Sequence, residues 1–257
     1  MNASTKKLQD LGQSLWVDNI SREMLVQGTL VRYITEWLVT GLTSNPTIFE
    51  HAIGHGSFYD DAIARLARRG EPAEELFFAL ALEDLTTAAD LFRPIFDTSD
   101  GRDGWVSLEV SPVLADNAAK TIHAAAWLHE AADRTNLFIN IPGTVAGAES
   151  IEHSVFEGLP VNVTLLFSRE QYLAAAEAYQ RGIERRLEAG LAPNARSVAS
   201  LFVSHWDVAV RQDVSPSLHN RLGIAIAMRT FKANRDLLAS PRWQRLAAAG
   251  TRPQRLV

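Results

Sequence analysis

The sequence contains no cysteine, which excludes disulfide bridges and thiol catalysis and fits a reducing cytoplasm. Lysine is nearly as scarce: the chain has only Lys6, Lys7, Lys120 and Lys232, and arginine carries the rest of the positive charge. The net charge is −5, so no basic surface predicts nucleic-acid binding. Residues 1–15 lack the apolar core of a signal peptide, and no apolar run reaches the roughly 20 residues that cross a bilayer. We therefore expect a cytoplasmic protein that binds neither nucleic acid nor a membrane.

Short apolar segments alternate with helical patterns along the 257 residues, a length that suits one large α/β domain or two small ones. The predicted strands cover residues 14–17, 41–44, 105–109, 137–141, 161–166 and 197–203. Because buried strands that alternate with helices are typical of a parallel sheet, we expect an α/β fold.

Polar residues recur where these strands end. They are Asp18, Asn45, Glu109, Asn140, Asn162, Thr164 and Ser200. A closed barrel brings the carboxyl ends of all its strands to one mouth, whereas an open doubly wound sheet often binds its ligand beside a glycine-rich loop. The sequence has no G-x-G-x-x-G after the first strand and no P-loop, which favours a (β/α)8 barrel type in a single domain, 1–257.

The stretch 136–144 is the most informative one. It reads as a buried strand, residues 137–141, that enters a turn at Pro142-Gly143, with Thr144 placed to cap the next helix. An apolar strand with one polar residue near its carboxyl end is how a barrel presents a side chain to its active site. Here that residue is Asn140.

Helix starts are marked by capping residues. Ser21 is expected to cap a helix that Gly28 breaks, and Ser168 has the capping-box spacing to a glutamine. Asn45-Pro46 and Ser111-Pro112 each combine a cap residue with proline at the first helical position.

Six strand motifs, in order, carry a likeness to a known family. They are Leu15-Trp-Val-Asp18, Gly41-Leu-Thr-Ser-Asn-Pro-Thr-Ile-Phe49, Val106-Ser-Leu-Glu-Val110, Asn136-Leu-Phe-Ile-x-Ile-Pro-Gly-Thr144, Val161-Asn-Val-Thr-Leu-Leu-Phe-Ser168 and Ser197-Val-Ala-Ser-Leu-Phe-Val203. The chain resembles transaldolase from about residue 10 to its end. The resemblance is to the bacterial type, which is also found fused to glucose-6-phosphate isomerase.

The resemblance implies a (β/α)8 barrel that needs no metal or cofactor. It also implies a pentose-phosphate-pathway reaction, the transfer of a dihydroxyacetone unit between sugar phosphates such as fructose 6-phosphate and sedoheptulose 7-phosphate. In the family a lysine on the fourth strand forms a Schiff base, and an aspartate and a glutamate move protons. By motif match the catalytic positions are Asp18, Glu109, Thr164 and Asn140, and the substrate-binding positions are Asn45, Asn162, Ser200, Phe202 and His205.

Three departures from the family motif matter. Asn140 stands where the family has its Schiff-base lysine, and His205 stands where it has a phosphate-binding arginine. Family members also continue beyond the sixth strand, so we expect a barrel truncated after about six βα units. A barrel with missing strands exposes sheet edges, which predicts self-association, a partner that covers the open edge, or marginal folding.

The chemistry of Asn140 leaves several functions open. The nitrogen of an amide is not nucleophilic, so Asn140 can only hydrogen-bond a substrate carbonyl, and Schiff-base activity is expected to be lost or severely impaired. The alternatives are a pseudoenzyme that binds a sugar phosphate or a protein, and a lysine-independent proton-transfer enzyme that uses Asp18 and Glu109. A degenerating gene product without a selected role is a further possibility.

Several polar residues also have a plain structural interpretation. His51 and His55 are four apart, as in a helical metal site, but Gly54 and Gly56 interrupt the helical pattern, so we expect solvated surface histidines and no metal. Asn45 suits a helix cap whether or not it binds sugar. Charged carboxylates at buried strand ends are costly unless they are paired or functional, so Asp18 and Glu109 are the stronger candidates.

Overall fold

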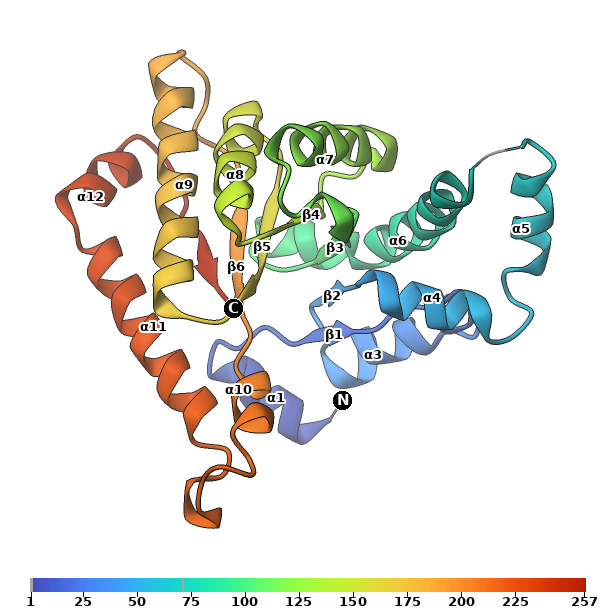
Figure 1. Cartoon of the computed structure of the whole chain (residues 1–257), viewed down its shortest axis with the longest axis horizontal. Coiled ribbons are helices and arrows are strands. Elements are labelled where there is room, and N and C mark those ends of the chain that lie inside the picture. The colour runs from blue at the N-terminus through green and yellow to red at the C-terminus, as the bar shows by residue number, and fades with distance from the viewer. Residues whose placement is uncertain (1, 71) are drawn as a thin grey trace. The chain divides into compact units, whose positions relative to one another are not determined.

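The computed structural model describes residues 2–70 and 72–257, and its elements are labelled in Figure 1. The chain is α/β, with parallel pairing between neighbouring strands and a strand order that follows the chain from β1 to β7. The strands are β1 Trp16–Asp18, β2 Gly41–Thr43, β3 Trp105–Glu109, β4 Leu137–Pro142, β5 Val161–Leu166, β6 Ser197–Leu201 and β7 Arg255–Leu256. This order is that of a (β/α)-barrel chain, so the predicted fold class is confirmed.

All six predicted strands are present, with ends that differ by a few residues from the predicted ones. The prediction of a barrel truncated after about six βα units included no strand beyond residue 203. The structure instead has the short strand β7, which pairs in parallel with β6 through Val198 opposite Arg255 and Ala199 opposite Leu256.

The residues fall into two compact units. The first runs to Glu109 and includes Leu128–Phe138, and the second comprises Val110–Trp127 and Ile139–Val257. Helices of the first unit are α1 Ala3–Asp10, α2 Arg22–Val26, α3 Thr29–Trp37, α4 Pro46–Gly54, α5 Asp60–Ala67 and α6 Ala73–Thr98. Those of the second are α8 Val145–Glu157, α9 Arg169–Glu188, α10 Ser204–Ala209, α11 Leu222–Leu238 and α12 Pro241–Ala248, while α7 Ala118–Ala132 has residues in both.

The aromatic core of the first unit forms around Phe138. Its ring stacks on Trp105 with centroids 3.8 Å apart, and Trp16 stacks on Phe138 at 6.4 Å. Phe96 meets Trp105 edge to face at 5.0 Å. Burial of large rings stabilises the strands that carry them, and such ring geometries add to the burial term.

In the second unit, helices α8 and α9 pack against each other, and both contact strand β5 (Figure 1). Gly182 on α9 makes this approach possible, because a Cβ there would lie 2.7 Å from the carbonyl oxygen of Glu152 on α8. The buried apolar strand β5 and the small-residue face of α9 are thus packed into one core.

Most of the predicted capping residues act as expected. Thr144 Oγ1 accepts a hydrogen bond from Gly147 N at 2.9 Å, and Asn45 Oδ1 accepts one from Ile48 N at 3.0 Å. Gly28 has a positive φ of 72° and separates α2 from α3, as its position suggested. The prediction for Ser111-Pro112 was wrong: Pro112–Leu114 is a single 3-10 turn in which Ser111 makes no side-chain cap, and α7 begins later. None of the helices in the described part of the chain combines the length and apolar character that a membrane crossing requires.

A buried carboxylate joins three segments of the first unit. Asp84 on α6 is 2% exposed. It accepts hydrogen bonds from Tyr59 Oη at 2.7 Å and from Arg22 Nε at 2.8 Å. Burial raises the pKa of Asp84, and the two hydrogen bonds oppose that increase. Because Arg22 follows β1 by only a few residues, this network fixes the start of α2 relative to α6.

Replacing Asp84 by alanine should destabilise the protein by about 3 kcal/mol, because the half-buried Arg22 and the buried hydroxyl of Tyr59 lose their shared acceptor. Asp90→Ala on the same helix is the matched control. Asp90 is ion-paired to Arg134, but its side chain is 59% exposed, so we expect a loss below about 1 kcal/mol. Urea denaturation of both variants measures the difference, and equal losses would contradict the structural role given to Asp84.

Candidate functional site

The two predicted carboxylates lie at the last residues of parallel strands in the first unit. Asp18 ends β1 and Glu109 ends β3, and β2 pairs with both strands. Because side chains alternate along a strand, Asp18 lies on the same face of β1 as Trp16, two residues earlier. The two groups interact electrostatically, because the charge of Asp18 contributes to the titration of Glu109.

Glu109 is the more perturbed of the pair. Burial raises its pKa from 4.5 to about 7, and the negative charge of Asp18 adds to the increase. Burial also raises the pKa of Asp18, although its residue surface is exposed and solvent screening limits the effect. A carboxyl group that titrates near neutrality can accept and return a proton, which is the property of a general acid–base catalyst.

Asn45 has a definite structural role. Its side-chain oxygen caps α4 through the bond from Ile48 N, and Pro46 occupies the first helical turn. The plain interpretation of Asn45 as a helix cap is therefore confirmed. The amide nitrogen has two N–H donors that the cap does not use.

Four polar residues of the second unit lie on one face of neighbouring strands, and we call them the amide cluster. They are Asn140, Asn162, Thr164 and Ser200. Asn140 pairs in register with Asn162, and Asn162 pairs with Val198, two residues before Ser200. Because side chains alternate along a strand, residues in register and residues two apart point to the same side.

The amide cluster includes a side-chain hydrogen bond and a buried acceptor without a partner. Ser200 Oγ donates to Asn162 Oδ1 at 2.8 Å. Asn140 is 3% exposed, and its Oδ1 is buried without a hydrogen-bond partner. Seven other buried side-chain atoms of the described residues are in the same state, so Asn140 is distinguished by its place near the end of β4 and not by this atom alone.

Strand β5 is irregular beside Thr164. The pairing with β6 shifts register between Val163 and Leu166, and Leu165 has a φ of 56° with its side chain partly in solvent. A leucine in the left-handed region is strained, and bulges of this kind often lie next to functional sites because they redirect side chains. Sequence reasoning missed the bulge, since a leucine in an apolar strand gives no signal of a positive φ.

Phe202 and His205 follow β6 and contact a third ring. Phe167 lies 5.5 Å from Phe202 and 5.9 Å from His205, and the last two rings are 5.4 Å apart. His205 is exposed on α10 and Phe202 is half-buried. The three rings lie beside the end of β6, where the family resemblance predicts substrate contacts.

His51 and His55 are exposed at the end of α4. Their rings stack with centroids 4.1 Å apart, and His55 Nδ1 lies 2.9 Å from the carbonyl oxygen of His51. Among residues 2–70 and 72–257, no group of three or more His, Asp or Glu side chains is arranged to hold a metal ion.

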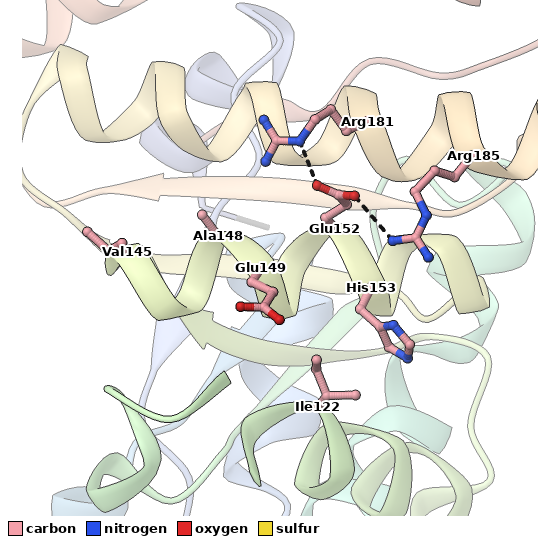
Figure 2. A pocket seen from close by; sticks show the side chains of 8 residues that line it. All are labelled: Ile122, Val145, Ala148, Glu149, Glu152, His153, Arg181 and Arg185. Carbon is pink, nitrogen blue, oxygen red and sulfur yellow. Dashed lines mark hydrogen bonds and ion pairs between the residues drawn. The ribbon is translucent and has the colours of Figure 1, made fainter. Parts of the chain in front are cut away.

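A separate pocket of about 440 Å³ lies on the helices of the second unit, and Figure 2 shows its lining. Glu152 on α8 accepts hydrogen bonds from Arg181 Nε at 2.6 Å and from Arg185 Nη1 at 3.2 Å. Burial opposes ionisation of Glu152, but the two arginines lower its pKa overall. Because these charges already neutralise one another and every lining residue lies on a helix, the pocket is a weaker candidate for catalysis than the strand ends.

Comparison with known proteins gives a consistent match. The model of the Transaldolase/Fructose-6-phosphate aldolase family matches residues 15–248. The chain is 41% identical to a transaldolase of Thiobacillus denitrificans, over 98% of this chain and 73% of that protein. It is 40% identical to a transaldolase of Thermobifida fusca, over 99% of this chain and 72% of the relative.

Replacing Glu109 by glutamine should remove a pH dependence of stability. The folded-state pKa of about 7 exceeds the ordinary value of 4.5, so the stability that protonated Glu109 contributes is present below pH 4.5 and is lost as the pH rises through 7. We expect Glu109→Gln to be more stable than the wild type, by a margin that grows by about 2 kcal/mol between roughly pH 5 and 8.

Urea denaturation across this pH range measures the margin. Asp18→Asn is the companion variant: without the charge of Asp18, the pH at which wild-type stability is lost should move down. A margin for Glu109→Gln that does not change with pH would show that the Glu109 pKa is not raised.

Proposed function

We propose that this chain, which belongs to the Transaldolase/Fructose-6-phosphate aldolase family, binds a sugar phosphate. We further propose that it does so without forming a covalent lysine adduct. The observation that carries the second part is the residue at position 140. This position resembles that of the family's Schiff-base lysine, and it holds an asparagine buried on β4.

The chemical consequence concerns the electron sink of the reaction. Cleavage of the carbon–carbon bond next to a ketone leaves a carbanion, which a protonated imine stabilises as an enamine. The lone pair of an amide nitrogen is delocalised, so Asn140 offers hydrogen bonds and no imine. Loss of a covalent step raises the barrier, and each factor of ten in rate corresponds to only about 1.4 kcal/mol.

The lysines of the chain do not offer a replacement. All four lie on helices and are exposed: Lys6 and Lys7 on α1, Lys120 in the first turn of α7, and Lys232 on α11. Lys232 also pairs with Asp236 at 3.1 Å. Catalytic amines are freed by burial, which these positions lack.

The remaining residues are assigned by the same resemblance. Asp18 and Glu109 would transfer protons, with Thr164 holding a water. Asn45 and Asn162 would bind sugar hydroxyls, and the other proposed substrate contacts are Ser200, Phe202 and His205. An imidazole binds phosphate only in its protonated form, so His205 would make a weaker phosphate ligand than an arginine.

A second candidate is a proton-transfer enzyme that needs no lysine, for example one that catalyses isomerisation or dehydration. The pKa of about 7 at Glu109 favours it, because a group poised near the working pH is an efficient acid–base catalyst. Product analysis with ketose phosphates separates this activity from binding without turnover. In either case we propose a cytoplasmic protein that needs no cofactor and descends from a pentose-phosphate-pathway enzyme.

The substitution Asn140→Lys tests the proposal. With the wild type, fructose 6-phosphate should raise the melting temperature, and borohydride should trap no sugar adduct. With Asn140→Lys, mass spectrometry should find a trapped adduct at position 140, because the amine then lies on the buried strand.

Asn140→Met is the matched control, since methionine has nearly the length of lysine and no amine. It should give no adduct. An adduct on any lysine of the wild-type chain would contradict the proposal, and a melting temperature that no sugar phosphate changes would contradict the binding part.

A further inference from the structure

Helix α11 is attached to the second unit by small and polar residues. Its buried residues are Gly223, Thr230 and Asn234. Asn234 Oδ1 accepts a hydrogen bond at 2.7 Å from the hydroxyl of Tyr172 on α9, the helix beside which α11 lies (Figure 1). A Cβ at position 223 would lie 2.5 Å from the carbonyl oxygen of Val203, so glycine permits the close approach there. None of these three buried residues is a large apolar one.

The exposed apolar residues of α11 lie along one line. Ile224, Met228 and Phe231 are 61%, 68% and 55% exposed. They follow one another at spacings of four and three residues, which places them on the same face of the helix. A surface helix ordinarily turns such a stripe to the core and its polar residues to solvent, so α11 has the reverse arrangement.

An arginine continues the line at each end. Arg221 lies three residues before Ile224, and Arg235 lies four residues after Phe231. Alternating spacings of three and four residues are those of the a and d positions in a helix that packs along another helix. We call the five residues Arg221, Ile224, Met228, Phe231 and Arg235 the α11 stripe. At 1.5 Å per residue, the two arginines are about 21 Å apart along the helix.

The unpaired charges of α11 are at the two ends of the stripe. Arg229 is paired with Glu170 at 3.0 Å, and Lys232 is paired with Asp236 at 3.1 Å. Arg221 and Arg235 are exposed, and neither makes an ion pair within the part of the chain that the structure describes. The surface complementary to the stripe is therefore apolar in its middle and acidic at both ends.

The same charges disfavour a second copy of α11 as the partner. Antiparallel packing about Met228 would place Arg221 of one copy opposite Arg235 of the other. Parallel packing would place each arginine opposite its own counterpart. Both arrangements bring like charges together, which is unfavourable at an interface.

We propose that the α11 stripe docks an amphipathic helix of another protein, whose acidic residues face Arg221 and Arg235. The three apolar side chains supply the contact area, and the two arginines set the register and reject basic helices. This binding surface is independent of the proposed sugar-phosphate site.

Two synthetic peptides test the surface by fluorescence anisotropy. Both are helix-forming and alanine-rich, with leucine at the three a and d positions that face the apolar residues. The acidic probe has glutamate at the two outer positions, and the basic probe has lysine there. The wild-type chain should bind the acidic probe about tenfold more tightly, because two attractive charge pairs replace two repulsive ones.

Charge reversal gives the sharpest control. In the double variant Arg221→Glu, Arg235→Glu the preference should invert, so that the basic probe binds more tightly. Met228→Asp should weaken the binding of both probes by about tenfold or more, because a carboxylate would lie in the apolar contact. Val113→Asp is the matched control: Val113 is 83% exposed outside the stripe, so both affinities should stay unchanged.

The other outcomes would overturn the proposal. Equal affinities for the two probes, or a preference that the double charge reversal leaves unchanged, would show that the arginines do not select the partner. If neither probe binds, sedimentation and vesicle binding identify what covers the stripe instead. Dimerisation that Met228→Asp abolishes would assign it to a second copy. Binding to phosphatidylserine–phosphatidylcholine vesicles that Met228→Asp abolishes would assign it to a lipid surface.

Discussion

The hydrogen-bonded register of β4, β5 and β6 is the constraint on which the second unit's chemistry depends. It places Asn140 opposite Asn162 and brings Ser200 to the same face. The register fixes the face of the sheet on which each side chain lies, because a slip by one residue would turn every side chain of the strand to the other face. The polar side chains are thus held in place by the same bonds that hold the apolar residues Ile139 and Val163 in the core. The fold and the proposed ligand binding therefore depend on the same backbone hydrogen bonds between β4, β5 and β6.

The first unit is organised by charge. Glu109 is uncharged over a wider pH range than an ordinary glutamate, because burial and the neighbouring Asp18 both oppose its ionisation. Asp84 differs from Glu109 in this respect. It is more deeply buried, but hydrogen bonds from Arg22 and Tyr59 compensate its charge. A buried carboxylate with partners serves structure, whereas one that keeps an unfavourable interaction is free to exchange a proton. The contrast within one unit is why Glu109, and not Asp84, is the candidate acid–base group.

The features that could be predicted from the sequence are those decided by residues close together in the chain. Thr144 and Asn45 were predicted as helix caps because capping is decided within a few residues. Ser111 carried the same signal and that prediction was wrong, because its side chain makes no cap and only the 3-10 turn Pro112–Leu114 follows it. The bulge at Leu165 was not predictable, because its φ of 56° reflects a register shift against β6 and no glycine marks it. The family motifs located the polar strand ends, but their hydrogen bonds and pKa values depend on neighbours that are distant in sequence.

Under the proposed function, binding and covalent catalysis depend on different residues, and catalysis depends on the residue at position 140. An enzyme accelerates its reaction only through interactions that are stronger in the transition state than in the bound substrate. The imine is of this kind, whereas hydrogen bonds between sugar hydroxyls and Asn162 or Ser200 would act in the ground state as well. On the proposed function, asparagine in place of the family's lysine would remove this transition-state contribution and would leave the ground-state contacts in place. Under the proposed function, the residue at position 140 therefore decides between covalent catalysis and binding alone.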